Sequence, residues 1–163
     1  MGVNNIVRSV SPKSIFESAL NVIDATSTWE QGDILVFDDT ANLIKKPAAE
    51  ADCSTMLGIA RVSISNGKLV SPYQGTAVDA AQAIQDIPGP VYGVIASLIL
   101  KTGDSINPGD LVYADPATGS RGVTVSGTKA IGIYQGKAIA GAAAGTSVEI
   151  LIGARHPADA LKF

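Results

Sequence analysis

The sequence is poor in the residues that most often carry chemistry. Its 163 residues include a single cysteine, Cys53, and a single histidine, His156. One cysteine excludes an internal disulfide and a four-cysteine zinc site within one chain. A Ser-His-Asp or Cys-His arrangement would have to use His156, which stands beside Pro157 in a segment without the neighbours that orient a catalytic base. We therefore expect a protein that is not an enzyme and that has no metal site.

Charge is also scarce. Charged residues make up 17% of the chain, below the typical quarter, and the net charge is −3. Because affinity for nucleic acid comes mainly from Lys and Arg displacing counterions from phosphates, no nucleic-acid partner is expected. The mean hydropathy of +0.26 is high for a soluble monomer, which predicts that part of the apolar surface faces another subunit.

Long apolar runs are missing. The longest, residues 91–100, falls far short of the roughly 20 residues that a membrane-spanning helix needs, and it predicts a long buried strand. The start of the sequence also lacks a basic segment followed by a continuous apolar stretch, so no secretory signal is expected. We expect a protein made in the cytoplasm, with no membrane partner and no cofactor.

What the sequence does contain is a repeat. Residues 32–38, Gly-Asp-Ile-Leu-Val-Phe-Asp, return as residues 109–115, Gly-Asp-Leu-Val-Tyr-Ala-Asp. Each copy is followed at a similar spacing by a second apolar stretch with an internal glycine, Gly58 in the first and Gly132 in the second. Two matched β units in one short chain predict a mainly β fold, a compact β-barrel or sandwich built from two pseudo-repeated units.

The rest of the chain divides around these units. Residues 1–27 lack the β pattern and predict an N-terminal arm; within it, Ser11 as N-cap, Pro12 at the first helical position and a helical spacing of apolar residues predict a short helix. Residues 28–154 are expected to form the β-barrel domain, with an insertion at about 65–90, and residues 155–163 a tail.

One local signal within the β domain is stronger than the others. Asn66-Gly67 readily takes the positive φ angles of a type I′ turn and predicts a hairpin between residues 56–65 and 68–73. The alanine-rich residues 76–86 predict a second short helix. Both features would belong to the insertion that is present only in the first repeat.

Three side chains in the β domain admit two interpretations. Asp33 and Asp110 invite comparison with paired catalytic carboxylates, but each follows a glycine, where an aspartate accepts backbone hydrogen bonds within its own turn, and we favour that structural role. Trp29 lies where the arm meets the barrel, and it is expected to be either a core residue or an interface anchor.

Roughly residues 28–154 resemble a known family, and the motifs that carry the resemblance lie in the second half of the chain. Residues 108–113, Pro-Gly-Asp-Leu-Val-Tyr, precede the turn Asp-Pro-Ala-Thr-Gly at 115–119, then Ala-Ile-Gly-Ile at 130–133, and finally Ala-Ala-Ala-Gly-Thr at 142–146 before the strand at 148–152. This arrangement resembles the head decoration, or cement, proteins of tailed bacteriophages, which are similar in kind to the lambda head decoration protein. The resemblance implies a small β-barrel or β-tulip that follows an arm and sits on the outer capsid surface of the virion.

The resemblance also implies a set of partners and contact residues. The protein would bind the major capsid protein of a phage head and form a homo-oligomer, with a trimer favoured. On this basis the capsid-binding residues are expected in the arm: Val3, Ile6, Val7, Ile15, Phe16 and Leu20. The oligomer interface is expected at Trp29, Tyr92 and Tyr113. Two other interpretations remain, the base of a head fibre or spike, and a small β-barrel enzyme with a pocket lined by Asp33, Asp110 and His156.

Overall fold

The computed structural model describes residues 23–70 and 93–153, and these residues are mainly β, as predicted. The helix expected near residues 11–23, the helix expected at 76–86 and the tail at 155–163 lie wholly or almost wholly outside the described residues. The strands are β1 (Ile34–Asp38), β2 (Leu43–Lys45), β3 (Met56–Ile59), β4 (Ile64–Ser65), β5 (Lys68–Leu69), β6 (Ile95–Leu100), β7 (Leu111–Ala114), β8 (Gly122–Thr124), β9 (Ala130–Tyr134) and β10 (Ser147–Ile152), and a 3-10 helix, η1, covers Glu50–Thr55.

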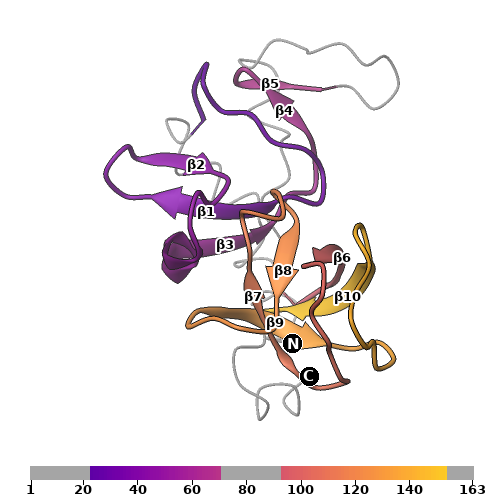
Figure 1. Cartoon of the computed structure of the whole chain (residues 1–163). Coiled ribbons are helices and arrows are strands. Elements are labelled where there is room, and N and C mark those ends of the chain that lie inside the picture. The colour runs from indigo at the N-terminus through magenta and orange to yellow at the C-terminus, as the bar shows by residue number, and fades with distance from the viewer. Residues whose placement is uncertain (1–22, 71–92, 154–163) are drawn as a thin grey trace, which may run out of the picture.

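The strands form three groups, which Figure 1 shows one beside the other. β1 lies at the centre of an antiparallel sheet with the order β2-β1-β3, and β4 and β5 form a small hairpin. The five remaining strands pair in the order β10-β6-β8-β7-β9, and β9 pairs again with β10, so that the ring closes. Only the β6–β8 pair in this ring is parallel. The ring is therefore made entirely by the second half of the chain.

The repeat seen in the sequence is present in the backbone. β1 pairs with β3 as β7 pairs with β9, and in each pair the register shifts by one residue at the same place, between Leu35 and Val36 and between Val112 and Tyr113. The partners of the first pair are Ile34↔Ile59, Leu35↔Gly58 and Val36↔Met56; those of the second are Leu111↔Ile133, Val112↔Gly132 and Tyr113↔Ala130. β1, β2 and β3 thus correspond to β7, β8 and β9.

The turn that opens each repeat is also the same. Gly32 and Gly109 have φ angles of 93° and 89°, a region that side chains with a Cβ avoid. The carboxylates of the next residues, Asp33 and Asp110, each accept a hydrogen bond from the backbone N–H three residues earlier, at 2.9 and 2.7 Å. The structural interpretation of these two aspartates is therefore the one that the backbone supports.

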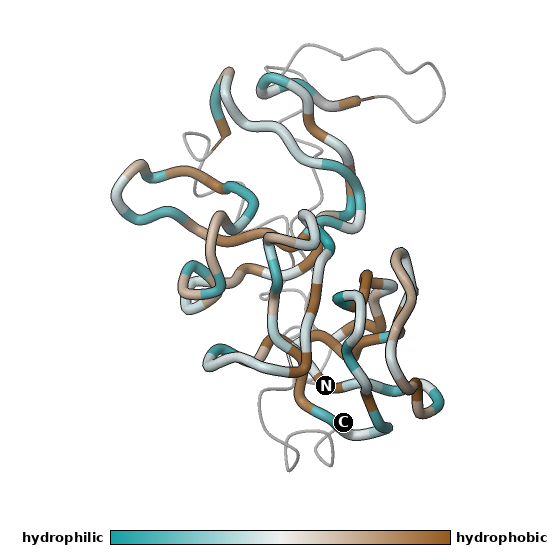
Figure 2. Tube along the Cα trace, in the orientation of Figure 1, coloured by the Kyte–Doolittle hydropathy of each residue, from teal (hydrophilic) through white to brown (hydrophobic). Residues whose placement is uncertain are grey.

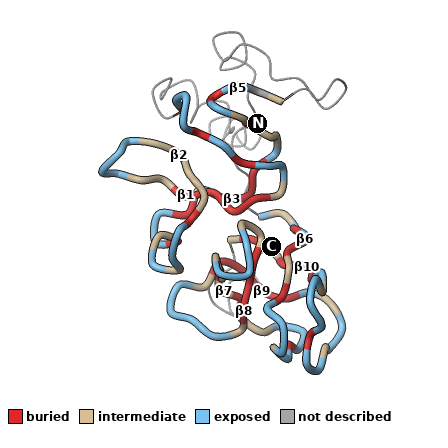
Figure 3. Tube along the Cα trace, turned by 45° about the horizontal axis from the view of Figure 1, so that its top comes forward, coloured by how far each residue is buried: buried red, intermediate tan, exposed pale blue. Residues whose placement is uncertain are grey.

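β1 is covered on both faces, as its continuous apolar run predicts. Successive side chains of a strand point to opposite faces, so Ile34 and Val36 lie on one side of β1 and Leu35 on the other. Ile34 and Val36 belong to the core cluster that fills the ring, whereas Leu35 packs in a second cluster with Trp29 and Ile44. In Figures 2 and 3 the apolar and buried stretches follow these strands, while the turns between them are polar and exposed.

The Asn66-Gly67 turn is confirmed, but the hairpin is shorter than expected. The two residues have φ angles of 50° and 73°, and the turn joins β4 to β5. The expectation that the strand beginning at Met56 would pair with the residues after Gly67 is wrong, because β3 pairs with β1 instead. The apolar run of β1 offers β3 a buried neighbour, which a solvent-exposed hairpin partner would not.

The long buried strand expected at residues 91–100 is shorter and only half-buried: β6 begins at Ile95, after two described residues that are not strand, and one of its faces is exposed. Its side chains alternate between the ring interior and solvent: Ala96, Leu98 and Leu100 are buried, and Ile95 is 61% exposed. No helix within the described residues is long and apolar enough to cross a membrane.

Candidate functional site: the outer face of β7

A buried polar joint fastens the first repeat to the second. The side chain of Asp33 is almost fully buried, and its carboxylate accepts a hydrogen bond from the Ser120 hydroxyl at 2.8 Å. The backbone N–H of Ile34 donates to the Ser120 carbonyl at 3.1 Å, and the Nε atom of Arg121 lies 3.5 Å from the same carboxylate. A buried carboxylate is tolerated only when it is paired in this way. Asp33 therefore has a structural role at the joint between the repeats.

Arg121 extends this joint over the glycine turn. A Cβ added to Gly32 would lie 3.5 Å from the Arg121 Nε atom, so the guanidinium covers the turn. The guanidinium also lies 3.3 Å from the carboxylate of Glu30, which is largely exposed. An exposed ion pair of this kind contributes little, about 0–1 kcal/mol. The hydrogen bonds of Ser120 with Asp33 and Ile34 therefore contribute more to the stability of the joint than this ion pair does.

The corresponding face of the second repeat is not covered in this way. A Cβ added to Gly109 would meet no atom within 4 Å. Leu111 and Tyr113, which correspond to Ile34 and Val36 of β1, are only half-buried, whereas Ile34 and Val36 are 1% and 0% exposed. Among the described residues, the second repeat thus presents a less fully covered copy of the face through which the first repeat docks. We name the surface formed by Asp110, Leu111 and Tyr113 the β7 face.

Two hollows flank the β7 face, and both include Leu111 and Tyr113. The first has a volume of about 320 Å³ and is completed by Cys53, Ser54, Thr128, Lys129 and Ala130. The second has a volume of about 430 Å³ and is completed by Ser105, Gly109, Asp110 and Val125. An aromatic side chain between two hollows is the arrangement in which interface side chains of a partner can interdigitate.

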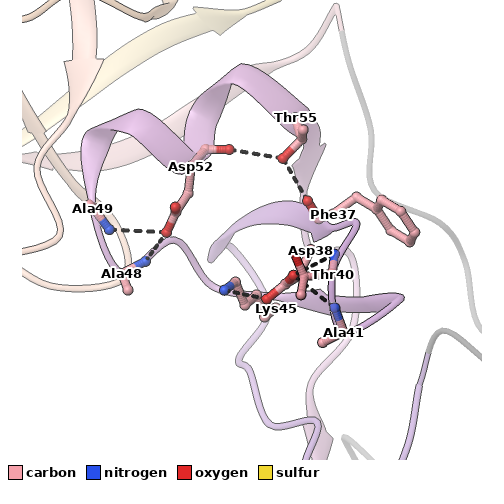
Figure 4. A network of polar contacts seen from close by, with 9 residues as sticks. All are labelled: Phe37, Asp38, Thr40, Ala41, Lys45, Ala48, Ala49, Asp52 and Thr55. Atoms are coloured by element: carbon pink, nitrogen blue, oxygen red, sulfur yellow. Dashed lines mark hydrogen bonds and ion pairs between the residues drawn. The ribbon is translucent and has the colours of Figure 1, made fainter.

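The 3-10 helix η1 forms one wall of the first hollow. The carboxylate of Glu50 accepts hydrogen bonds from the backbone N–H groups of Thr128 and Lys129, which hold the pKa of Glu50 below its usual value. At the other side of η1, the Thr55 hydroxyl donates to the Phe37 carbonyl at 2.6 Å, as Figure 4 shows. The helix is thereby fixed between β1 and the residues that directly precede β9.

The second carboxylate of η1 closes its first turn. Asp52 accepts hydrogen bonds from the backbone N–H groups of Ala48 and Ala49, at 2.8 and 3.1 Å (Figure 4). These contacts satisfy donors at the start of the helix that have no partner within it. Cys53 lies in the same helix and is buried, with 4% of its surface exposed. The thiol is therefore part of the core rather than an accessible nucleophile.

The predicted site residues fall in different places. Trp29 is 2% exposed, its Nε1 donates to the Val62 carbonyl at 3.1 Å, and it bridges to Ile64, so of its two expected roles it fulfils that of a core residue. Tyr113 lies on the β7 face. Its part in an oligomer interface, like that of Trp29, stays a prediction. Tyr92 and the six arm residues, Val3, Ile6, Val7, Ile15, Phe16 and Leu20, lie outside the described residues.

The two aspartates of the expected enzyme pocket do not share either hollow beside β7. Of the two hollows beside β7, Asp110 lines one and Asp33 lines neither. His156 lies outside the described residues. Within residues 23–70 and 93–153, no group of three or more His, Cys, Asp or Glu side chains is placed to hold a metal ion.

Comparison of the sequence with protein-family models and with curated proteins finds no match. The function must therefore be argued from the fold and the β7 face. Sequence reasoning identified Tyr113 but missed Leu111, Ser120 and Arg121. The only signal for Leu111 is its place in the repeat opposite Ile34, and no sequence pattern marks the other two.

Proposed function

We propose that this chain is a non-enzymatic head decoration protein of a tailed bacteriophage, which binds the outer surface of the capsid and bridges neighbouring major capsid protein subunits. The observation that carries this proposal is the β7 face. The first repeat buries the equivalent face against the second, whereas Leu111 and Tyr113 of the second are only half-buried in the structure. A face that is buried in one repeat and partly exposed in the other supports a role in assembly.

The composition of the β7 face favours a protein partner. Tyrosine is enriched at the centres of protein interfaces because it combines a large apolar ring with a polar end and loses little conformational entropy. The two hollows beside Tyr113 give the surface concavities that a partner's side chains could fill, and the Asp110 carboxylate adds a hydrogen-bond acceptor. In the proposal this face contacts a neighbouring subunit in a trimer, the oligomer that the family resemblance favours.

The fold is compatible with the same family. The closed ring of β6 to β10, with the sheet β2-β1-β3 packed against it, fits the small β-barrel or β-tulip of head decoration proteins. The N-terminal arm would supply the contact with the shell through Val3, Ile6, Val7, Ile15, Phe16 and Leu20. An extended arm can add a strand to an exposed sheet edge, and an oligomer that carries several arms multiplies modest affinities.

A stabilising mechanism follows from mass action. A protein that binds only the expanded shell, and not its separated subunits, stabilises the expanded shell by about 2.7 kcal/mol per site at a free concentration one hundred times its dissociation constant. Many such sites on one shell would oppose rupture when packaged DNA pushes outward.

The decisive experiment measures binding to shells. Purified protein is mixed with expanded and unexpanded shells of the major capsid protein encoded with it, and occupancy is imaged. We expect binding across expanded shells only. Binding confined to vertices would indicate the base of a fibre instead, and no binding to either form would remove the proposal.

Two variants locate the contacts. Tyr113→Asp places a charge on the β7 face and is expected to lower occupancy at least tenfold, whereas Gln135→Asp, at an exposed position outside both hollows, introduces the same charge and should bind as the unchanged protein. Deletion of residues 1–16 removes five of the six expected arm contacts and should abolish shell binding. Full occupancy by either Tyr113→Asp or the deletion would exclude the corresponding surface.

A further inference from the structure

β8 and β2 occupy equivalent places in the two repeats, but their outer edges differ. In the ring, the outer edge of β8 pairs in parallel with β6, through Ile99↔Gly122 and Leu100↔Val123. The backbone N–H of Lys101, which directly follows β6, donates to the Val123 carbonyl at 2.8 Å. This parallel pairing is what closes the ring beside β8.

The outer edge of β2 offers the same backbone groups. Ile44 pairs with Phe37 of β1 as Val123 pairs with Ala114 of β7. In an antiparallel pair the N–H and C=O groups of alternate residues point away from the partner strand. The backbone N–H and C=O groups of Val123 point away from β7 and toward β6. Because Ile44 holds the equivalent position, its N–H and C=O groups point away from β1. No residue among 23–70 and 93–153 is hydrogen-bonded to them across this edge.

A hollow marks the place where the first repeat is open. It has a volume of about 270 Å³ and separates the turn at Thr26, Ser27 and Thr28 from β2. In the ring the equivalent gap is bridged, because the Asp104 carboxylate accepts hydrogen bonds from the Thr124 hydroxyl at 2.6 Å and from the Val125 N–H at 3.1 Å.

The residues that correspond to this bridge have other partners in the first repeat. Ser27 takes the place of Asp104, and its hydroxyl accepts a hydrogen bond from the Asp24 N–H at 3.1 Å. Lys45 takes the place of Thr124, and its ammonium lies 2.6 Å from the Asp38 carboxylate (Figure 4). The turn before β1 is therefore held to itself rather than to β2, and no hydrogen bond from this turn reaches the edge of β2 among the described residues.

The chain nevertheless enters the first repeat at the place that β6 occupies in the second. Ile23 corresponds to Leu100, and it packs in the same cluster as Ile44, as Leu100 packs in one cluster with Val123. Both Ile23 and Ile44 are buried. The described chain thus reaches the side of β2 at Ile23, and a segment tethered there would have a high effective concentration at the edge.

We propose that the open edge of β2 is the docking site for the N-terminal segment of this same chain, with Val22 and Ile23 pairing in parallel with Leu43 and Ile44. On docking, the Asp24 N–H leaves the Ser27 hydroxyl and donates to the Ile44 carbonyl, as Lys101 donates to Val123. The segment before Val22 then leaves the fold at a fixed point. This proposal does not depend on the function proposed above.

A pair of cysteines tests the register. Val22→Cys and Leu43→Cys are combined with Cys53→Ser, and the control combines Val22→Cys and Cys53→Ser with Thr40→Cys, at an exposed position in the β1–β2 turn. Neighbouring residues of paired strands meet the Cα separation that a disulfide requires. We expect the first pair to form an intramolecular disulfide at least ten times faster than the control. Equal rates, or a disulfide that links two chains, would overturn the proposal; the second result would assign the edge to another copy.

Hydrogen exchange provides an independent test without cysteines. The Ile44 amide should exchange at least ten times faster in a chain that lacks residues 1–22 than in the full chain. The Val123 amide is the matched control, since it occupies the same position in the ring and should keep its exchange rate. Unchanged exchange at Ile44, with Val123 still protected, would show that the N-terminal segment does not cover this edge.

Discussion

Asp33 and Ser120 are joined by a hydrogen bond of 2.8 Å although 87 positions separate them in the sequence. This hydrogen bond lies within the buried polar joint between the repeats, where the neighbouring residue Ile34 is 1% exposed. Because a buried polar group without partners is costly, the two repeats must be held in one relative position for the Asp33 side chain to keep its hydrogen bonds.

Replacing the two equivalent aspartates measures this joint. Asp33→Ala and Asp110→Ala both remove a carboxylate that accepts a backbone hydrogen bond in its turn. Only Asp33→Ala also removes the acceptor of the Ser120 hydroxyl and one of the two carboxylates beside Arg121. We expect a loss in the free energy of unfolding of about 3 kcal/mol for Asp33→Ala and about 1 kcal/mol for Asp110→Ala, measured by chemical denaturation. Equal losses would show that the joint contributes nothing to stability.

Two glycines of the ring are expected to respond differently to alanine. At Gly132 an added Cβ would meet the Leu151 carbonyl oxygen and lie 2.6 Å from Cγ2 of Ile150, so β9 and β10 would have to separate. We expect Gly132→Ala to cost about 3 kcal/mol. Gly145 has a φ angle of 78° and open space around its Cα, so Gly145→Ala should cost only the strain, about 1 kcal/mol. Thermal unfolding midpoints rank the two, and the reverse order would contradict the packing of β9 on β10.

The Glu50 contact predicts a pH dependence. The backbone N–H groups of Lys129 and Thr128 lower the pKa of Glu50 from its ordinary value of 4.5. A group whose pKa is lower in the folded state stabilises the protein above its unfolded pKa, and this stabilisation is lost as the pH falls through the folded pKa. Glu50→Gln should therefore reduce stability most at pH 7, and the difference should shrink as the pH falls below 4.5.

Urea unfolding midpoints across this range check the prediction. Glu149→Gln, at an exposed position on β10, is the matched loss of one carboxylate. A Glu50→Gln difference of the same size at every pH would show that charge has no part in the contact between η1 and the residues after β8.

Trp29 gives a spectroscopic reporter of the first repeat, because it is the only tryptophan in the chain. Its burial predicts fluorescence emission at short wavelength and little quenching by acrylamide in the folded protein. Trp29→Ala should cost about 3–5 kcal/mol, as expected for a buried aromatic side chain. Strong quenching in the native state would contradict its place in the core beside Leu35 and Ile44.

The sequence was sufficient to predict the mainly β fold, the repeat and the Asn66-Gly67 turn, because each depends on local chemistry. In each repeat a glycine with positive φ is followed by an aspartate that accepts a hydrogen bond from a backbone N–H of its own turn. This pattern involves only neighbouring residues, so it can be recognised from the sequence alone. The same locality identifies an Asn-Gly turn.

What the sequence did not predict depends on contacts between distant residues. Nothing near Ser120 or Arg121 distinguishes them from other turn residues, and their roles arise only because the Gly32-Asp33 turn docks against them. The parallel pairing of β6 with β8 and the open edge of β2 were missed for the same reason. For Trp29 the sequence left two roles, and the carbonyl of Val62, far along the chain, is what satisfies the indole N–H in the core.

The ring closes within residues 95–152, so it does not depend on the first sheet for any of its hydrogen-bonded neighbours. Tension applied at the N-terminal side therefore reaches the ring through the first sheet, the Asp33 joint and the contact of Glu50 with Thr128 and Lys129. Under load the molecule should lengthen in two stages, with the first sheet peeling away while the ring keeps its shape. A protein anchored through its N-terminus would then extend under load before its ring unfolds, rather than resist the load as one rigid body.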